Sequence, residues 1–522
     1  MAMSRQSALI VFVAVLASLL EIIDSSIVNV ALPTMMGNLG ATLEDISMVV
    51  TGYAIANAIV LPVSAWLGER IGRRTYYLGC IALFTATSVA CGLAPNLPTL
   101  IVFRILQGLA GGALLPTSQT LIYEQFPKEK AGMAGAIFGM SVMIGPALGP
   151  VMGGYLTDNF GWRSIFNVNL PLGMLTFFVG ALVIFDPDYI KEKKDKVKPA
   201  LDSIGLALLV AGIGCLQYTL ERGQPDDWFS SGTICFTATV AAICLPSFIW
   251  WELRVPNPII NVRLFKESVV AFGVMLMGCL GLFLYGLVFA LPIFLSNTFH
   301  YDATQVGEMF IPGSLLTMVM MPVIGRLMQA KVNPKLLIFL GFTCLELTCV
   351  IMTTFSPLSS REQILYMLYM RGFALAFLFV PLNSTILSQF SGLQMGQVSG
   401  LLNLFRQIGG SMGIAMVATL LDVLSKQNYL DLVSKVSLLN PNVQSYYMQV
   451  TGAFSNKLAR EVGFNWGSQT ALKTLLYKLE AQVFMLSFLQ LVFVMMFLVG
   501  LAYIPLALIR FKRQAVKIVD AH

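Results

Sequence analysis

The sequence predicts an all-α polytopic membrane protein with 14 transmembrane helices, arranged as two repeats of six helices with two further helices inserted between them. The 522-residue chain is 57% hydrophobic and only 11% charged, which leaves too little polar surface for a soluble protein. Apolar runs long enough to cross a bilayer recur along almost its whole length. A weak internal repeat relates the early part of the chain to the late part, and this predicts two related halves.

Each predicted span is an apolar run of about 20 residues. The runs lie at 8–33, 46–67, 76–94, 98–120, 132–156, 164–185, 203–221, 232–251, 269–295, 305–328, 335–355, 363–387, 397–421 and 481–509. Because their number is even, both termini lie on the same side of the membrane. Lysines and arginines cluster on the side of Arg5, whereas the short loops of the other side hold Arg163, Arg222 and Arg361. The positive-inside rule therefore predicts that both termini are cytoplasmic.

The composition argues against metal, nucleic-acid and enzymatic functions. The eight cysteines lie in or beside apolar runs without the paired spacing of a disulfide or zinc site, and the two histidines are His300 and His522. The net charge of +6 is spread over short loops rather than gathered on one domain. The sequence contains no phosphate-binding loop and no Ser/His/Asp set. We therefore expect no metal, no cofactor, no nucleic-acid partner and no catalytic residue.

The first span carries two acids, Glu21 and Asp24, inside an apolar run. A charge near the centre of a spanning helix costs about 2.5–3.5 kcal/mol on insertion scales, so such residues normally face a wet cavity or an opposite charge. The polar residues of this span share one helical stripe: Ser18, Glu21, Asp24, Ser25 and Asn29. We expect this stripe to face water or substrate. The alternative is that Asp24 only reaches the headgroups at the outer end of the helix.

The first half contains two more sets of polar and charged residues, one in a loop and one in a span. The loop after the second span has a glycine turn flanked by charges, and we interpret it as a cytoplasmic gate formed by Glu69, Arg70, Gly72, Arg73 and Arg74. A plain turn with positive-inside charges is the alternative. In the fourth span, Arg104 and Gln107 share a stripe. Because arginine keeps its proton, Arg104 needs an anion within the membrane, and the candidates are the two acids of the first span.

The fifth span contains two Gly-Pro pairs among glycines four residues apart: Gly145, Pro146, Gly149, Pro150, Gly153 and Gly154. Glycines at this spacing let another helix approach closely, and prolines remove backbone donors and bend the helix. We interpret this segment as a hinge or seal between gates. The alternative is that the segment serves only helix packing, which by itself can produce the glycine spacing. Packing alone does not explain the two prolines.

The chain divides at a basic stretch after the sixth span. We expect a six-helix unit at 1–185, a basic cytoplasmic linker at 186–202, two extra helices with a cytoplasmic loop at 203–267, and a second six-helix unit at 268–522. The repeat favours this division, because 115–122 resembles 380–387 and 135–149 resembles 400–414.

The second half carries its own charged residues in apolar runs. Arg371 lies in the twelfth span, and Asn403 and Arg406 share a face of the thirteenth. Arg406 is at mid-span, so we expect it to hold a carboxylate or backbone carbonyls, or to offer its charge to an anionic substrate. The sequence pattern indicates no partner for Glu346 in the eleventh span.

A long connection at 422–480 separates the last two spans. Its helical apolar spacing is broken at 440–442 and at Gly463, which predicts an ordered outer subdomain of two or three helices. A disordered loop is the alternative. Because two antiparallel spans need only a few linking residues, we expect the segment to dock a partner or, alternatively, to cap the outer gate.

These motifs together resemble the fourteen-span drug:proton antiporters of the major facilitator superfamily, in particular the EmrB-type inner-membrane pumps. The segments at 24–33, 65–74, 104–108 and 145–154 are similar to the signatures of this family, and phrases at 162–171, 220–228 and 257–265 look like the same branch. The loop departs from its signature at two positions. Ala65 stands where the family usually has glycine, and Glu69 where it has aspartate.

The resemblance implies two pseudo-symmetric six-helix bundles that rock about a midplane cavity lined mainly by spans one, four, nine and twelve. It places Glu21, Asp24, Arg104 and Arg371 around that cavity. Asp24 is then the principal proton carrier, and Glu21 assists it or meets a cationic substrate. The resemblance implies proton-driven export of amphipathic drugs across a bacterial inner membrane, with a periplasmic membrane-fusion adaptor and an outer-membrane channel as partners. A dedicated exporter of one metabolite, such as a siderophore or fatty acid, is one alternative, and a membrane sensor or scaffold that transports nothing is another.

Overall fold

The computed structural model describes residues 4–187, 202–299, 301, 303–436, 441–461 and 467–509, apart from the side chains at 43, 146, 147, 150, 303, 304 and 453–471. This part of the chain is helical, with no strand in it. Among the described residues, 13 helices are long and apolar enough to cross a membrane. The helix at Ala131–Phe160, which corresponds to the predicted span 132–156, is not one of the 13. The chain is therefore an all-helical polytopic membrane protein, and the count of 14 spans stays a prediction.

Eight helices form the N-terminal half. They are α1 (Arg5–Leu39), α2 (Leu43–Ile71), α3 (Arg73–Gly92), α4 (Leu97–Gly111), α5 (Leu114–Glu124), α6 (Ala131–Phe160), α7 (Ser164–Asn167) and α8 (Asn169–Val183). Side chains of Thr42 and Asn96 cap α2 and α4 by accepting from backbone N–H groups of the first turn. Gly72 turns the chain from α2 into α3 with a φ of 103°, which favours glycine. The fourth predicted span is thus two helices, α4 and α5, with a break at 112–113.

The inserted helices are α10 (Ser203–Arg222) and α11 (Gly232–Glu252). The C-terminal half contains α12 (Ser268–Phe299), α13 (Ala303–Gln329), α14 (Pro334–Thr353), α15 (Arg361–Leu387), α16 (Gly392–Val433), α17 (Pro441–Glu461) and α18 (Gly467–Leu508). Helix pairing repeats between the halves. α1 packs against α6 and α8 as α12 packs against α16 and α18, and α2 packs against α4 as α13 packs against α15. The predicted linker at 186–202 lies mostly outside the described residues.

The glycine segment of the fifth span packs inside its own half. Gly145, Gly149 and Gly153 of α6 face α1, and a Cβ added at Gly153 would lie 2.9 Å from the backbone oxygen of Ile27. A Cβ at Gly149 would meet the side chain of Ser26. These glycines therefore let α6 approach the helix that carries the two acids. The side chains of the two prolines lie outside the described part of the chain, and the hinge role stays a prediction.

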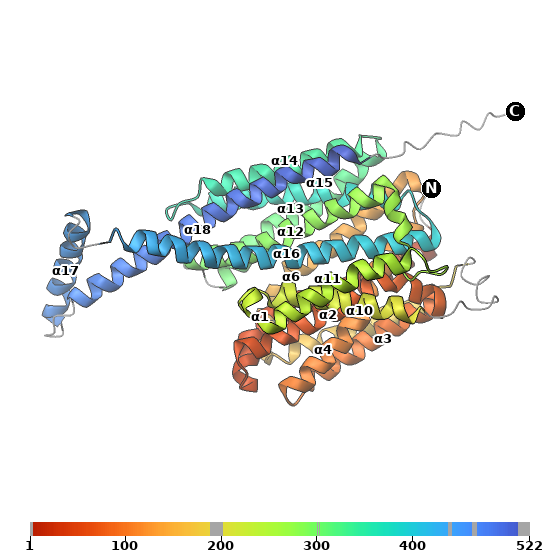
Figure 1. Ribbon diagram of the computed structural model, residues 1–522, viewed down its shortest axis with the longest axis horizontal. Helices are drawn as coiled ribbons and strands as arrows, with labels where there is room; N and C mark the ends of the chain where they lie inside the picture. Colours follow the sequence, from red (N-terminus) through yellow and green to blue (C-terminus); the bar gives the residue numbers. More distant parts are fainter. Residues whose placement is uncertain are drawn as a thin grey trace.

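Several helix contacts join the two halves, including those of α6 with α15 and of α5 with α16. α6 packs against α13 and α2 packs against α16. Gly132 of α6 and Gly325 of α13 are so close that a Cβ on either would lie 2.8 Å from the backbone oxygen of the other. The inserted helix α10 contacts both α2 and α16 (Figure 1). Gln217 Nε2 of α10 donates to Ser411 Oγ of α16 at 2.6 Å. The inserted pair therefore lies at the junction rather than on one half alone.

Helices occupy the described part of the outer segment at 422–480, for which the sequence predicted an ordered subdomain of two or three helices. α16 and α18 run far beyond the other helices, and α17 lies at their far end, opposite the two chain termini (Figure 1). Each of the two is 42 residues long, which is about 63 Å at the rise of an α-helix, whereas a bilayer core of about 30 Å needs about 20 residues. Asn428 Nδ2 of α16 donates to Ser487 Oγ of α18 at 2.9 Å in this region. In the described part of 422–480, the end of α16 and the start of α18 thus continue two spanning helices, and α17 is a separate helix between them.

Candidate functional site

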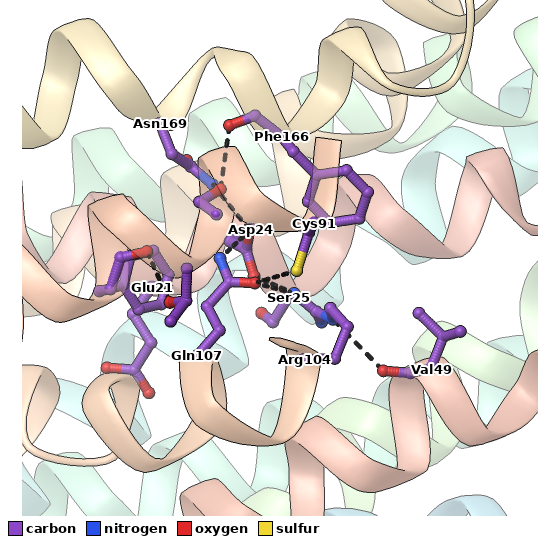
Figure 2. Close-up of polar contacts among 12 residues, drawn as sticks. Glu21, Asp24, Ser25, Val49, Cys91, Arg104, Gln107, Phe166 and Asn169 are labelled. Carbon is purple, nitrogen blue, oxygen red and sulfur yellow. Dashed lines mark hydrogen bonds and ion pairs between the residues drawn. The ribbon is translucent and has the colours of Figure 1, made fainter. Parts of the chain in front are cut away.

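Asp24 lies at the centre of a buried network in the N-terminal half (Figure 2). Arg104 Nη1 of α4 donates to Asp24 Oδ2 at 2.6 Å, and Gln107 Nε2 donates to Oδ1 at 2.9 Å. Asn169 Nδ2 at the start of α8 donates to the same Oδ1 at 2.7 Å. The exposed fraction is 0% for Asp24 and 1% for Arg104. Both oxygens of the carboxylate are therefore satisfied by a guanidinium and two amides, as a buried charge requires.

Arg104 has further contacts that do not depend on Asp24. Its Nε donates to the backbone oxygen of Val49 at 3.3 Å, and its Nη1 also donates to Gln107 Oε1 at 2.9 Å. Its Cζ lies 4.2 Å from the ring centroid of Tyr53. The sequence predicted an acid of the first span as partner of this arginine, and the structure shows that the acid is Asp24.

Glu21 lies one turn earlier on α1 and has different partners. Asn57 Nδ2 of α2 donates to Glu21 Oε1 at 2.8 Å, and the backbone N–H of Leu115 in α5 donates to Oε2 at 3.0 Å. Arg406 of α16 interacts electrostatically with Glu21, but no ion pair within 4.0 Å joins these two described residues. Glu21 is 4% exposed, so it is a buried carboxylate held by neutral donors.

The polar stripe of α1 is divided in the structure, which corrects the expectation that all of it faces water or substrate. Glu21 and Asp24 are buried, as is Ser18, whose Oγ donates to the backbone oxygen of Ala14 at 2.9 Å. The acids are buried because side chains from α4 and α8 close over Asp24 while α2 and α5 close over Glu21. Ser25 and Asn29 are exposed, and Asn29 Nδ2 reaches only the backbone of its own helix, so Asn29 is not part of the network.

The two arginines of the C-terminal half that the sequence singled out, Arg371 and Arg406, do not join the Asp24 network. Arg406 is 4% exposed, its Nε and Nη1 have no hydrogen-bond partner among the described residues, and its Cζ lies 5.7 Å from the ring centroid of Phe379. The carboxylate partner expected for it is therefore not found. Arg371 faces Phe310 of α13, 5.3 Å from the ring centroid, and not Asp24 or Arg104. In the described part of the chain, Glu346 Oε2 on α14 is also buried without a partner.

A neutral cluster joins the two halves beyond Glu21. Gln119 Nε2 of α5 donates to Asn383 Oδ1 of α15 at 2.6 Å. Ser399 Oγ and Asn403 Nδ2, both on α16, donate to Gln119 Oε1 at 2.5 and 2.9 Å. All four residues are buried. Asn403, a predicted cavity residue, is thus engaged with the opposite half.

The charged loop between α2 and α3 holds the ends of two other helices. Arg73 Nη1 and Nη2 donate to the two carboxylate oxygens of Glu124, at 2.8 and 2.7 Å, at the end of α5. The backbone N–H of Arg74 donates to Asp186 Oδ1 at 2.8 Å, and its Nη2 to the backbone oxygen of Ala181 at 2.7 Å. Arg70 stacks over a ring of its own helix, 5.4 Å from the centroid. A cavity of about 30 Å³ lies between this loop, α5 and α16, and its lining includes Glu69, Arg73, Thr120 and Gly396.

Sequence reasoning missed four amides of the site: Asn57, Asn169, Gln119 and Asn383. Each is a polar side chain in or beside an apolar run, and the cost of burying such a group was the signal that could have found it. Asn169 lies in the family-like phrase at 162–171, and Gln119 lies in the repeat segment at 115–122. Their partners come from helices distant in the sequence, so spacing gave no sign of the contacts.

This arrangement provides two buried carboxylates and two buried arginines near the middle of paired helical bundles. Within the described part of the chain, no group of three or more His, Cys, Asp or Glu residues could hold a metal ion. Related bundles with buried charged groups between the membrane faces are the architecture of secondary transporters.

Comparison with known proteins agrees with this class. Residues 14–414 match the family model of the Major Facilitator Superfamily. The chain is 33% identical over 436 residues to the multidrug export protein EmrB of Haemophilus influenzae, covering 83% of this chain and 84% of that protein. It is 34% identical over 407 residues to the fatty acid resistance protein FarB of Neisseria gonorrhoeae, covering 78% and 79%. The crystal structure of the human organic anion transporter MFSD10 has the same fold, with a TM-score of 0.61 at 13% identity over 97% of this chain and 100% of that one. The chain belongs to the major facilitator superfamily.

Proposed function

We propose that this protein is a proton-coupled exporter of amphipathic compounds that works by alternating access in a bacterial inner membrane, with both termini in the cytoplasm. The observation that carries the proposal is the buried pair of Asp24 and Arg104. The relatives named as multidrug export proteins support the substrate class. The proton gradient supplies the driving force, so transport requires no cofactor and no catalytic residue.

The chemistry of the pair suits proton exchange. Ionised Asp24 binds Arg104 tightly, and a proton on the carboxyl would remove the charge that holds the guanidinium. Arg104 keeps its own proton, so it must turn to other partners when Asp24 is neutral. Gln107 Oε1, the backbone oxygen of Val49 and the ring of Tyr53 already contact it. The network can therefore exist in two states that differ by one proton, as an exchanger requires.

A liposome assay tests the proposal. The purified protein would be placed in liposomes containing a pH-sensitive dye, and cationic, neutral and anionic amphiphiles would be added without an imposed gradient. We expect at least one class to move protons in exchange for itself, with no response in protein-free liposomes. A sensor or scaffold would give no proton movement with any class, and that result would contradict the proposal.

A specific observation favours a second candidate, a dedicated exporter of an amphipathic acid. Arg406 is a buried guanidinium with two nitrogen atoms that lack partners among the described residues, and a substrate carboxylate would satisfy them. The relative named as a fatty acid resistance protein fits this reading. In the same liposomes, 2-naphthoate should then move protons while its neutral amide does not, and Arg406→Gln should remove the response. A response to all classes alike would favour the multidrug reading.

We also propose that the pump works with a periplasmic membrane-fusion adaptor and an outer-membrane channel. The outer ends of α16 and α18, with α17, project beyond the bundles in a direction that suits such a partner (Figure 1). Between α16 and α18 lies a largely apolar cavity of about 560 Å³, lined in part by Tyr429, Leu430 and Phe484. The alternative is that the same segment caps the outer gate. Deleting it distinguishes an effect on resistance in whole cells from an effect on transport across the membrane.

A further inference from the structure

The fourth span is broken beside Glu21. α4 ends at Gly111 and α5 begins at Leu114. The N-cap residue of α5, Ala113, has no side chain that can accept from the first turn, and the first N–H groups of any helix lack partners within it. The N–H of Leu115 is satisfied by Glu21 Oε2 instead, at 3.0 Å. A carboxylate from α1 thus caps the start of α5.

The same short helix holds the two halves together at its other positions. Leu115, Gln119 and Tyr123 are spaced by four residues, so they lie on one face of α5. Gln119 bonds to the C-terminal half in the cluster described above, which we name the amide latch and define as Gln119, Asn383, Ser399 and Asn403. One turn later, the Tyr123 hydroxyl and Ser384 Oγ share a hydrogen bond of 3.1 Å.

We propose that Glu21 and Gln119 are positioning residues of the transport cycle, coupled through α5. The charge on Glu21 holds the start of α5, and α5 holds the halves closed on the cytoplasmic side through the amide latch. The assignment of that side, and the direction of proton entry, rest on the proposed function.

The charges around Glu21 determine whether proton uptake strengthens or weakens the contact between the halves. Asp24 on the same helix and Arg406 on α16 are the charged groups near Glu21, and Tyr53 of α2 and Tyr77 of α3 are neutral titratable groups beside it. Ionised Glu21 accepts charge-assisted hydrogen bonds, which are stronger than those to a neutral acceptor. Protonation weakens the bonds from Asn57 and Leu115 and cancels the attraction of Arg406 across the halves. Proton uptake therefore loosens α5 and the latch, so the protonated protein can open to the cytoplasm and release its proton there.

Distance measurements between the halves test this inference. Spin labels would be placed at Lys128, after α5, and at Ser391, before α16, which are both exposed. Attaching them through unnatural residues keeps the eight native cysteines in place. The full chain would be measured in lipid nanodiscs without substrate or gradient, by pulsed electron spin resonance. We compare wild type, Glu21→Gln, Gln119→Leu and Thr120→Val. Thr120 is the matched control, because its hydroxyl bonds only within α5, to the backbone oxygen of Pro116 at 2.9 Å.

We expect the wild type and Thr120→Val to be closed at alkaline pH and to shift to longer distances on acidification. Glu21→Gln should favour long distances at every pH. Gln119→Leu should raise the long-distance population at alkaline pH by about fivefold or more, as the loss of one or more typical hydrogen bonds implies. Asn383→Ala is the second latch variant if Gln119→Leu is not monodisperse.

Two results would overturn the inference: a wild-type pH response in Glu21→Gln, or closed latch variants at alkaline pH. Neither would affect the proposed function, which the liposome assay tests separately. If the distances respond as expected while no amphiphile moves protons in liposomes, the proposed function fails and the coupling stands.

Discussion

Arg104 is buried in a membrane-spanning bundle, and its stability there depends on Asp24. The pair is 2.6 Å apart with almost no exposure, and amides from α4 and α8 complete the hydrogen bonding of the acid. Removing one partner of a buried pair leaves the other charge uncompensated, which costs more than removing both.

We predict that Arg104→Met destabilises the protein by about 3–5 kcal/mol, because Asp24 is left charged and buried. The double variant Arg104→Met with Asp24→Asn should recover much of that loss. Thermal unfolding of the purified proteins in one detergent measures both. An Arg104→Met protein as stable as wild type, or a double variant no more stable than Arg104→Met, would contradict this account of the pair.

For single residues, the sequence identified the charged side chains of the site, but it did not predict which residues surround them. An arginine and two acids in apolar runs require partners on energetic grounds alone, so Arg104, Asp24 and Glu21 could be found. Helical spacing defines a stripe but not what covers it. The exposure of Asn29 and the burial of Asp24 on the same stripe therefore had to come from the structure.

Among the elements, α6 packs against α1 beside the candidate site. Gly149 faces Ser26, two residues after Asp24, and Ser26 Oγ donates to the backbone oxygen of Gly145 at 3.0 Å. Any displacement of α6 therefore reaches the helix segment that carries the acid.

We predict that Gly149→Leu abolishes transport without preventing membrane insertion, because the side chain would meet Ser26 and force α6 away from α1. Overpacking of this kind typically costs about 1–3 kcal/mol. Gly154→Leu is the matched control, since a Cβ there meets nothing within 4 Å. Transport and thermal unfolding would be measured for both. Wild-type transport by Gly149→Leu would rule out a hinge or seal at this contact.

Sequence patterns also did not predict where some of the helices are interrupted or how far they extend. The run 98–120 is one candidate membrane span, Leu97–Glu124, as predicted, but its helix is interrupted at Gly112 and Ala113 and its second part has separate partners. Glycines in an apolar run are compatible with both a packed helix and a break, so only the tertiary contacts decide. The sequence also placed the ends of two spans at 421 and 481, but it did not show that α16 and α18 continue beyond these positions without a break.

For the whole molecule, the two halves meet through α6 with α13 and α15, through α2 and α5 with α16, and through the inserted helix α10. The fold class followed from the sequence because hydropathy and span length strongly constrain a membrane protein. The contacts between the halves could not be predicted from the sequence, because they pair residues far apart in the chain, such as Gln119 with Asn383.

We predict that deleting 440–468 and rejoining the ends removes drug resistance in whole cells while leaving proton-coupled drug movement in isolated vesicles. The deletion removes α17 and the start of α18 but leaves Asp24, Arg104 and the contacts between halves in place. Immunoblots of the membrane fraction would control for expression. Unchanged resistance in whole cells would exclude both a docking and a gating role for this segment.

The most direct test of the account is the proton coupling of Asp24→Asn. Asparagine keeps the size of the side chain but cannot exchange a proton. In liposomes, we predict that amphiphile-driven proton movement is lost in this variant and kept in Asp158→Asn, which removes an exposed carboxylate from the same half. Binding of the amphiphile should remain measurable in both. Coupled export at the full wild-type rate by Asp24→Asn would show that another group carries the proton and would contradict the central role given to this residue.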